Sequence, residues 1–255
     1  SHGLAKKVVV ADTVAVIADA AFGDVPGLST PAAWLGVVAY TLQIYFDFSG
    51  YSDMAIGLGK MFGFHFLENF NYPYISRSMG EFWRRWHISL GTWIRDYIYL
   101  PLGGSRLGEV RTQVNLFIIF FLCGLWHGAS WNYVIWGIYN GIIILIERSR
   151  VTVYRRKLWF PLQVIVFMLI FMFGMVIFCN PTLSAAWHYF LVMIGLVGEA
   201  GSTPREWRAS FWRRRPARAA RERVLEPREA LVRQEVEVQP LARALVVRSD
   251  DDTRR

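Results

Sequence analysis

The chain has 255 residues, of which 54% are hydrophobic and 16% aromatic. This apolar content exceeds that of an ordinary soluble domain of the same size and indicates a membrane protein. The formal net charge is +8, but residues 201–255 carry 14 Arg against 9 acidic residues and so hold 5 of the 8 excess charges. The rest of the chain is nearly balanced, which argues against nucleic acid as a partner.

The two cysteines, Cys123 and Cys179, lie 56 residues apart inside apolar runs. This spacing predicts neither a disulfide framework nor a metal site, and small buried hydrophobic side chains are the preferred interpretation. The chain starts SHGLAKK, without an initiator Met or the pattern of a signal peptide. We therefore expect the natural N-terminus to lie further upstream.

The N-terminal quarter predicts two helices. Residues 4–22 are apolar but interrupted by two aspartates, a pattern typical of a helix at the membrane edge or packed in a bundle. After the break GDVPGLSTP, a second helix is expected from Ala32 to about Phe64. It carries Asp47 and Asp53, and because acids are costly at membrane depth, both should face the bundle interior or an aqueous cavity.

Residues 69–111 combine many aromatic side chains with six arginines and few long aliphatic runs. That mixture is typical of short amphipathic and re-entrant helices at the membrane interface, where Trp, Tyr and Arg lie at headgroup level. Within this segment, PLGGSR predicts a turn.

Three apolar runs follow, at residues 113–126, 131–146 and 158–178. Only the third, with 21 residues, is long enough for a hydrocarbon layer of about 30 Å. The first has 14 residues, which reach about 21 Å, so we expect that it does not cross alone. An apolar stretch from Ala185 predicts a further partial span. The predicted fold class is all-α, a polytopic transmembrane helical bundle with re-entrant and interfacial amphipathic helices.

The distribution of basic residues predicts which loops share a side of the membrane. Residues 147–157 hold five basic residues and one acid, and the positive-inside rule places them, like the arginine-rich segment 69–111, on the cytoplasmic side. The chain would then enter the membrane after Arg111 and return by Glu147, with a bend near WHGAS. This puts His127 deep within the protein, at a helix break whose glycines let backbones approach closely.

From Gly201 the composition changes to an arginine-rich tail without lysine and without an aromatic residue after Trp212. We expect residues 201–255 to be disordered or weakly helical and to lie against anionic headgroups. Residues 1–200 would form the membrane domain, and no function is assigned to the tail.

His127 and His87 are the two of five histidines that suggest chemistry. His127 interrupts the apolar run GLWHGASW, and an ionisable group at membrane depth indicates a functional site. A neutral imidazole can accept a proton from a hydroxyl group. The alternative for His127 is a helix-packing histidine bonded to a backbone carbonyl.

His87 lies in FWRRWHISL, three residues after Arg84. Arg84 and Arg85 could together bind an anionic, phosphate-bearing ligand, because guanidinium groups match phosphate geometry. The alternative for His87 is an interfacial histidine bonded to lipid headgroups. No residue pattern indicates a metal site.

Three stretches together resemble the membrane-bound O-acyltransferase (MBOAT) family: YFDFSGYSDMAIGLGKMFGF, NFNYPYISRSMGEFWRRWHISLGTWIRDYIYLPLGG and GLWHGASWNYVIWGIYNG. The resemblance runs in order over roughly residues 3–200 and is greatest to the bacterial branch that acetylates alginate. Members usually carry several further spans before the segment matched here as GLAKKVVVAD, and the arginine-rich tail is not a family feature. We therefore expect residues 1–200 to be the C-terminal part of an MBOAT membrane domain.

The resemblance implies a multi-pass enzyme of the bacterial inner membrane. It would transfer an acetyl group from a thioester, such as acetyl-CoA, to hydroxyls of an exported polysaccharide such as alginate, without a bound cofactor. His127 would be the catalytic histidine, and His87 would line the same tunnel. Arg84 and Arg85 would hold donor phosphates, and Trp126 would form a wall of the path. The expected partners are the lipid bilayer, the acyl thioester, and the polysaccharide acceptor or periplasmic acetyltransferase proteins.

Asp47 and Asp53 would tune or hydrate the tunnel, with hydrogen bonding inside the helix bundle as their alternative role. Two other functions remain open. One is transfer of D-alanyl or another acyl group from a carrier-protein thioester to teichoic acid. The other is a membrane transporter in which the two aspartates and His127 form a proton relay.

Overall fold

The computed structural model describes residues 2–23, 25–148 and 158–197, so the tail and most of the basic loop 147–157 lie outside the described residues. The described residues form helices and loops without a strand, which confirms the all-α prediction. The longer helices are α2 (Asp12–Gly23), α3 (Thr30–Met61), α6 (Glu109–Trp126), α7 (Trp131–Arg148), α9 (Phe160–Cys179) and α10 (Leu183–Met193). The short ones are α1 (His2–Ala5), η1 (Lys6–Ala11), η2 (Val25–Gly27), η3 (Pro73–Ile75), α4 (Met79–Trp83), α5 (Ile88–Ile94) and η4 (Arg95–Tyr99).

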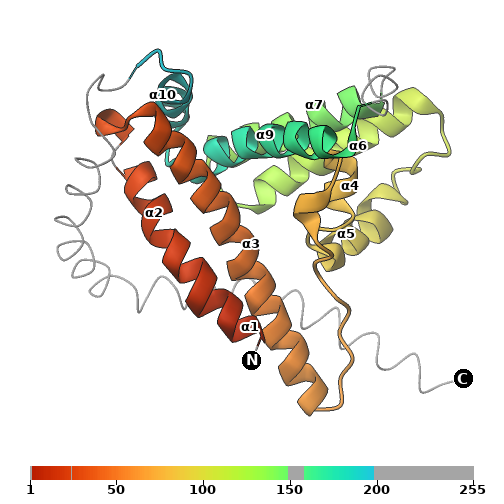
Figure 1. Cartoon of the computed structure of the whole chain (residues 1–255). Coiled ribbons are helices and arrows are strands. Elements are labelled where there is room, and N and C mark those ends of the chain that lie inside the picture. The colour runs from red at the N-terminus through yellow and green to blue at the C-terminus, as the bar shows by residue number, and fades with distance from the viewer. Residues whose placement is uncertain (1, 24, 149–157, 198–255) are drawn as a thin grey trace, which may run out of the picture. The chain divides into compact units, whose positions relative to one another are not determined.

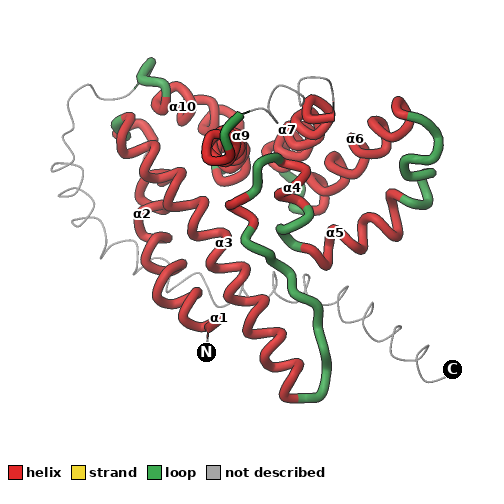
Figure 2. The backbone as a smooth tube through the Cα atoms, turned by 45° about the vertical axis from the view of Figure 1, so that its right-hand side comes forward, coloured by secondary structure: helices red, strands yellow, loops and turns green. Residues whose placement is uncertain are grey.

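Helices α2 and α3 lie side by side and antiparallel (Figures 1 and 2). Small side chains make this possible, because a Cβ atom at Gly36 would lie only 2.2 Å from the Cβ of Ala21. Helix α10 packs against both α3 and α9 and thereby joins this pair to the rest of the helices. The buried Tyr189 of α10 donates a 2.8 Å hydrogen bond to the carbonyl of Ala33.

Helices α6 and α7 form the antiparallel hairpin that the charge pattern predicts. At its open end, Arg148 forms an ion pair of 3.1 Å with Glu109. Near the bend, a Cβ atom at Gly124 would lie 2.4 Å from the carbonyl oxygen of Tyr133, and one at Gly137 would lie 2.4 Å from that of Phe120. The two backbones therefore touch where only glycine fits.

The bend itself spans residues 127–130 and confirms the predicted helix break. Gly128 has a φ of +148°, and a Cβ atom there would lie 2.9 Å from the ring of Tyr133. His127 directly follows the last residue of α6. It thus lies at the opposite end of the hairpin from Glu109, about 27 Å along the helix.

Among the described residues, two helices are long and apolar enough to cross a membrane, Glu109–Trp126 and Phe160–Cys179. The second is the run predicted to span. The first was expected to be too short, but α6 begins at Glu109 and adds a turn before the apolar run, which gives 18 residues. Whether the helices cross as a polytopic bundle with re-entrant pieces stays a prediction.

Helix α4 packs its large side chains into the core, and the interfacial position expected for segment 69–111 stays a prediction. Met79, Phe82 and Trp86 are 1%, 0% and 8% exposed. The ring of Phe82 lies 4.6 Å from that of Phe171 in α9. Two arginines directly follow this short helix, and of these Arg84 is exposed and Arg85 is half-buried. The exposed Trp93 fits the interfacial prediction for the later part of the segment.

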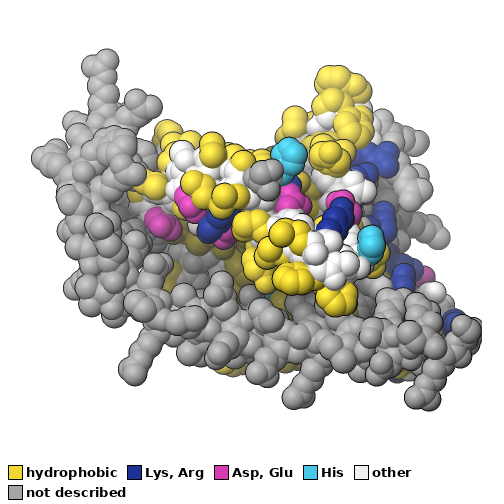
Figure 3. Space-filling model, turned by 90° about the horizontal axis from the view of Figure 1, so that it is seen from below, with side chains coloured by type: hydrophobic (Ala, Val, Ile, Leu, Met, Phe, Trp, Pro, Cys, Tyr) yellow, Lys and Arg dark blue, Asp and Glu magenta, His cyan; other side chains and the backbone are white. Residues whose placement is uncertain are grey.

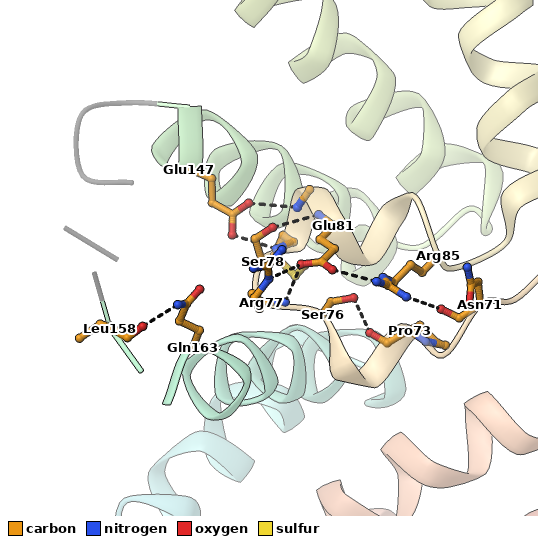
Figure 4. Close-up of polar contacts among 12 residues, drawn as sticks. Asn71, Pro73, Ser76, Arg77, Ser78, Glu81, Arg85, Glu147, Leu158 and Gln163 are labelled. Carbon is orange, nitrogen blue, oxygen red and sulfur yellow. Dashed lines mark hydrogen bonds and ion pairs between the residues drawn. The ribbon is translucent and has the colours of Figure 1, made fainter. Parts of the chain in front are cut away.

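Polar contacts fix the start of α4 to the end of α7 (Figure 4). The carboxylate of Glu147 accepts hydrogen bonds from the backbone N–H groups of Met79 at 2.8 Å and of Gly80 at 3.0 Å. Ser78 caps the same helix by accepting from the N–H of Glu81 at 3.0 Å. Three donors that a helix start leaves without intrahelical acceptors are satisfied in this way, and one of the two acceptor residues, Glu147, is 67 and 68 residues from its donors in the sequence.

We predict that Gly124→Val destabilises the protein by about 1–3 kcal/mol, because the new methyl groups would force the α6 and α7 backbones apart. Thermal unfolding of the protein purified in detergent measures the change. Gly57→Ala is the matched control, since nothing lies within 4 Å of a Cβ atom at Gly57. Equal melting temperatures for the Gly124 variant and the unaltered protein would contradict the close contact.

We also predict that Glu147→Ala lowers stability by about 1–3 kcal/mol, because two part-buried backbone donors lose their acceptor. Glu109→Ala removes a carboxylate from the same end of the hairpin, but its ion pair with Arg148 is exposed and should contribute little. Denaturant unfolding compares the two variants. An equal loss of stability in both variants would contradict the hypothesis that Glu147 fastens the start of α4.

Candidate active site

The ring of His127 lies among aromatic rings contributed by three helices. It is edge-on to Trp136 of α7 at 5.1 Å and 90°, and to Phe178 of α9 at 5.2 Å and 88°. Trp126, the last residue of α6, lies at 4.9 Å and 67°. The helix break holds the imidazole at this junction because the chain turns there from α6 into α7.

The polar neighbours of His127 in the sequence are engaged elsewhere. Asn132 donates hydrogen bonds to the backbone carbonyls of Asn180 at 2.6 Å and Ile177 at 3.3 Å. It therefore fastens the start of α7 to the end of α9 and keeps Phe178 against the His127 ring.

His87 lies beside Trp126 and precedes α5. Its ring is 6.5 Å from that of Trp126 and is edge-on to Phe48 of α3 at 4.8 Å and 89°. Its backbone has a φ of +46°, a conformation that non-glycine residues rarely adopt and that the surroundings must stabilise. Since Trp126 contacts both imidazoles, the structure brings together the two histidines that the sequence singled out.

The pKa of His87 is lowered to about 4. Burial is the larger cause, and the nearby His127 is the smaller one. His87 lies in the short-helix segment between α3 and α6, outside the two candidate spans. It is therefore neutral at physiological pH and holds one proton on its two ring nitrogens. A neutral imidazole can act as a hydrogen-bond donor on one edge and as an acceptor on the other.

Trp136 contributes a feature that the sequence did not reveal. Its side chain is 4% exposed, and its indole N–H has no hydrogen-bond partner within the part of the chain that the structure describes. Buried indole N–H groups usually find an acceptor. The Trp136 ring lies 5.1 Å from that of His127, and its N–H is a donor available to an acceptor oxygen.

Arg84 and Arg85 differ in their surroundings. Arg85 forms an ion pair of 3.0 Å with Glu81 and donates a 3.1 Å hydrogen bond to the carbonyl of Asn71 (Figure 4). Burial alone would raise the pKa of Glu81, but hydrogen bonds from Arg77 and Arg85 outweigh it and lower that pKa. Arg84 is exposed. A phosphate-binding role for the two arginines stays a prediction, and Arg84 is the more accessible of them.

Asp47 and Asp53 form ion pairs with the N-terminal lysines. Lys7 lies 2.7 Å from Asp47, and Lys6 lies 2.7 Å from Asp53. All four side chains are between 33% and 45% exposed. Seen from below, acidic and basic side chains lie next to one another within a hydrophobic surface (Figure 3). These contacts fit the alternative role of the aspartates in joining helices, and their role in a tunnel stays a prediction.

The described residues contain no cluster of His, Cys, Asp and Glu that could hold a metal ion. Cys123 and Cys179 are free thiols, as their spacing predicts. Trp126 is 52% exposed, and its ring lies 4.9 Å from that of His127 and 6.5 Å from that of His87.

Comparison with known proteins identifies the family. A family model described as MBOAT, membrane-bound O-acyltransferase family, matches residues 25–183. The chain belongs to this family. The matched range covers both histidines and the whole α6–α7 hairpin.

Several curated MBOAT relatives are similar to the chain. A probable alginate O-acetylase AlgI of Pseudomonas aeruginosa is 51% identical over 192 residues, which are 75% of this chain and 37% of the relative. A peptidoglycan O-acetyltransferase of Helicobacter pylori is 40% identical over 78% of this chain and 38% of the relative. A teichoic acid D-alanyltransferase of Bacillus subtilis is 34% identical over 43% of this chain and 30% of the relative. The chain thus spans less than two fifths of the length of these MBOAT relatives.

Burial lowers the pKa of His87 from 6.5 to about 4 in the folded protein. As the pH falls through this interval, His87 therefore binds a proton in the unfolded chain before it does so in the folded one. We predict that stability decreases over this interval and that His87→Gln reduces the decrease. Melting temperatures measured across this pH range provide the test. An identical pH dependence in the variant and the unaltered protein would mean that His87 is not buried in neutral form.

Proposed function

We propose that the protein transfers an acetyl group from a thioester, such as acetyl-CoA, to a hydroxyl of an exported polysaccharide. The observation that carries the proposal is the pair of histidines, His87 and His127, assembled around Trp126 inside the family match. Membership of an O-acyltransferase family supports the reaction class, and the similarity to an alginate O-acetylase over 75% of the chain supports the acceptor class.

In the proposed reaction, His127 accepts the proton of the acceptor hydroxyl as its oxygen attacks the thioester carbonyl carbon. The carbon–sulfur bond breaks, an ester forms, and the thiolate leaves as a thiol after it receives the proton from His127. The rings of Trp136 and Phe178 exclude water that would hydrolyse the thioester. The indole N–H of Trp136, which has no partner among the described residues, is suited to stabilise the negative charge that develops on the carbonyl oxygen.

We further propose that the protein is a multi-pass protein of the bacterial inner membrane, with donor and acceptor approaching from opposite faces. The two candidate spans and the family support a membrane location. Arg84, exposed at the end of α4, is the proposed contact for donor phosphates. Periplasmic acetyltransferase proteins are the proposed partners, and no bound cofactor takes part.

Transfer of a D-alanyl group to teichoic acid is the second candidate, because the similarity to a teichoic acid D-alanyltransferase extends over 43% of the chain. The O-acetyltransferase relatives match 75% and 78% of it, which favours acetyl transfer. Offering acetyl-CoA and a D-alanyl carrier protein to the same preparation discriminates the two.

We predict that His127→Ala lowers the rate of acetyl transfer by about 10²- to 10⁴-fold, the usual contribution of a general base. The measurement is thioester-dependent acetylation of polysaccharide by the membrane protein that carries this chain. Membrane abundance must be matched, and His65→Ala, at an exposed histidine, is the control. Near-normal turnover of the His127 variant would refute its role as the base, and thioester-independent passage of substrate would favour a transporter.

A further inference from the structure

The side-chain oxygen of Asn69 is a common acceptor for His87 and Ser89. It accepts hydrogen bonds from the backbone N–H of Ser89 at 3.1 Å and from its hydroxyl at 3.0 Å. The same oxygen lies 3.3 Å from Nδ1 of His87. Asn69 itself lies in the loop between α3 and η3 and is separated from His87 by 18 residues.

These contacts determine where the His87 ring carries its proton. A backbone N–H can only donate, so the Asn69 atom that faces Ser89 must be the amide oxygen rather than the nitrogen. An amide oxygen can only accept, so Nδ1 of His87 must donate to it. The other neighbour of Nδ1 is the Ser89 hydroxyl, at 3.4 Å. Because this hydroxyl donates its own proton to Asn69, its oxygen can only accept a hydrogen bond from Nδ1.

A neutral imidazole has one N–H proton, so a proton on Nδ1 leaves a lone pair on Nε2. We propose that Asn69 is a positioning residue that holds His87 as the Nδ1–H tautomer, so that Nε2 accepts a hydrogen bond from a substrate hydroxyl. This rests on the proposed function. It excludes a role for neutral His87 as a donor to the acyl carbonyl, and assigns it to the sugar side of the reaction.

The backbone around Asn69 holds this arrangement in register. The N–H of Ile88 donates to the carbonyl of Asn69 at 3.0 Å, and the N–H of Asn71 donates to the carbonyl of Arg85 at 2.9 Å. The segment 69–71 is therefore bound to the segment 85–88 on both sides of His87. These bonds stabilise the unfavourable φ of +46° at His87 and fix the direction of its ring.

The direct test is ¹⁵N NMR of the protein labelled at histidine, with the His87 signals assigned by their loss in His87→Gln. We expect a protonated Nδ1 and an unprotonated Nε2 at neutral pH. In Asn69→Leu, which removes the acceptor at similar volume, we expect this preference to be lost. A protonated Nε2 in the unaltered protein, or an unchanged tautomer in Asn69→Leu, overturns the proposal.

Asn69→Asp keeps the acceptor oxygen, so the Nδ1–H tautomer should persist. The pKa of His87 should rise above about 4 in this variant, because the carboxylate stabilises the imidazolium. This variant also decides the matter if Asn69→Leu does not accumulate, since an unchanged titration would contradict the contact. Asn71→Leu is the matched control, because the contacts of this exposed asparagine run through its backbone.

Kinetics separate the positioning role from the proposed function. In Asn69→Leu, kcat/KM for the polysaccharide acceptor should fall at least about 10-fold, with Asn69→Asp restoring most of it and Asn71→Leu unchanged. A preparation with the expected tautomer but without acetyl transfer would refute the function while leaving the tautomer assignment intact. Normal kcat/KM in Asn69→Leu would refute the assignment of His87 to the acceptor.

Discussion

The burial of Phe82 is the interaction on which the arrangement of the histidines depends. Its ring is fully buried against Phe171 of α9 and Trp86, and it holds the five-residue α4, too short to be stable alone, inside the helix bundle. His87 follows α4 after three residues, so the packing of Phe82 helps to fix the position of His87. Phe82 and the hydrogen bonds of Glu147 to the start of α4 together set the position of this segment relative to the α6–α7 hairpin.

The hairpin supplies the other half of the site by a different physical means. Its two backbones touch at Gly124 and Gly137, which leaves His127 at the bend with little freedom. The α9 helix then closes the site with Phe178. Aromatic packing and close backbone contact, rather than charge pairing, therefore build the surroundings of both imidazoles, and such surroundings keep imidazoles neutral and exclude water.

Several charged side chains form ion pairs or hydrogen bonds that connect one segment of the chain to another. Glu147 holds the start of α4, Glu81 holds Arg85, and the N-terminal lysines hold the aspartates of α3. Arg85, Asp47 and Asp53 thus form ion pairs within the chain, and Arg84 is the more exposed of the two arginines. Charged groups therefore lie at the contacts between elements, and aromatic rings surround the two histidines.

The sequence by itself determined the helices, the break at His127, the antiparallel return of the chain and the family, because apolar runs, glycines and basic flanks are local signals. It misjudged the length of α6, whose polar first turn looked like loop, and it did not reveal that Met79 and Phe82 of α4 are buried in the core. Only the tertiary structure decided that His87 lies beside Trp126, that the Trp136 indole N–H has no partner among the described residues, and that the side-chain oxygen of Asn69 lies 3.3 Å from Nδ1 of His87. The contacts of His87 with Trp126 and with Asn69 join residues 39 and 18 positions apart, and no local periodicity encodes which distant partner a side chain meets.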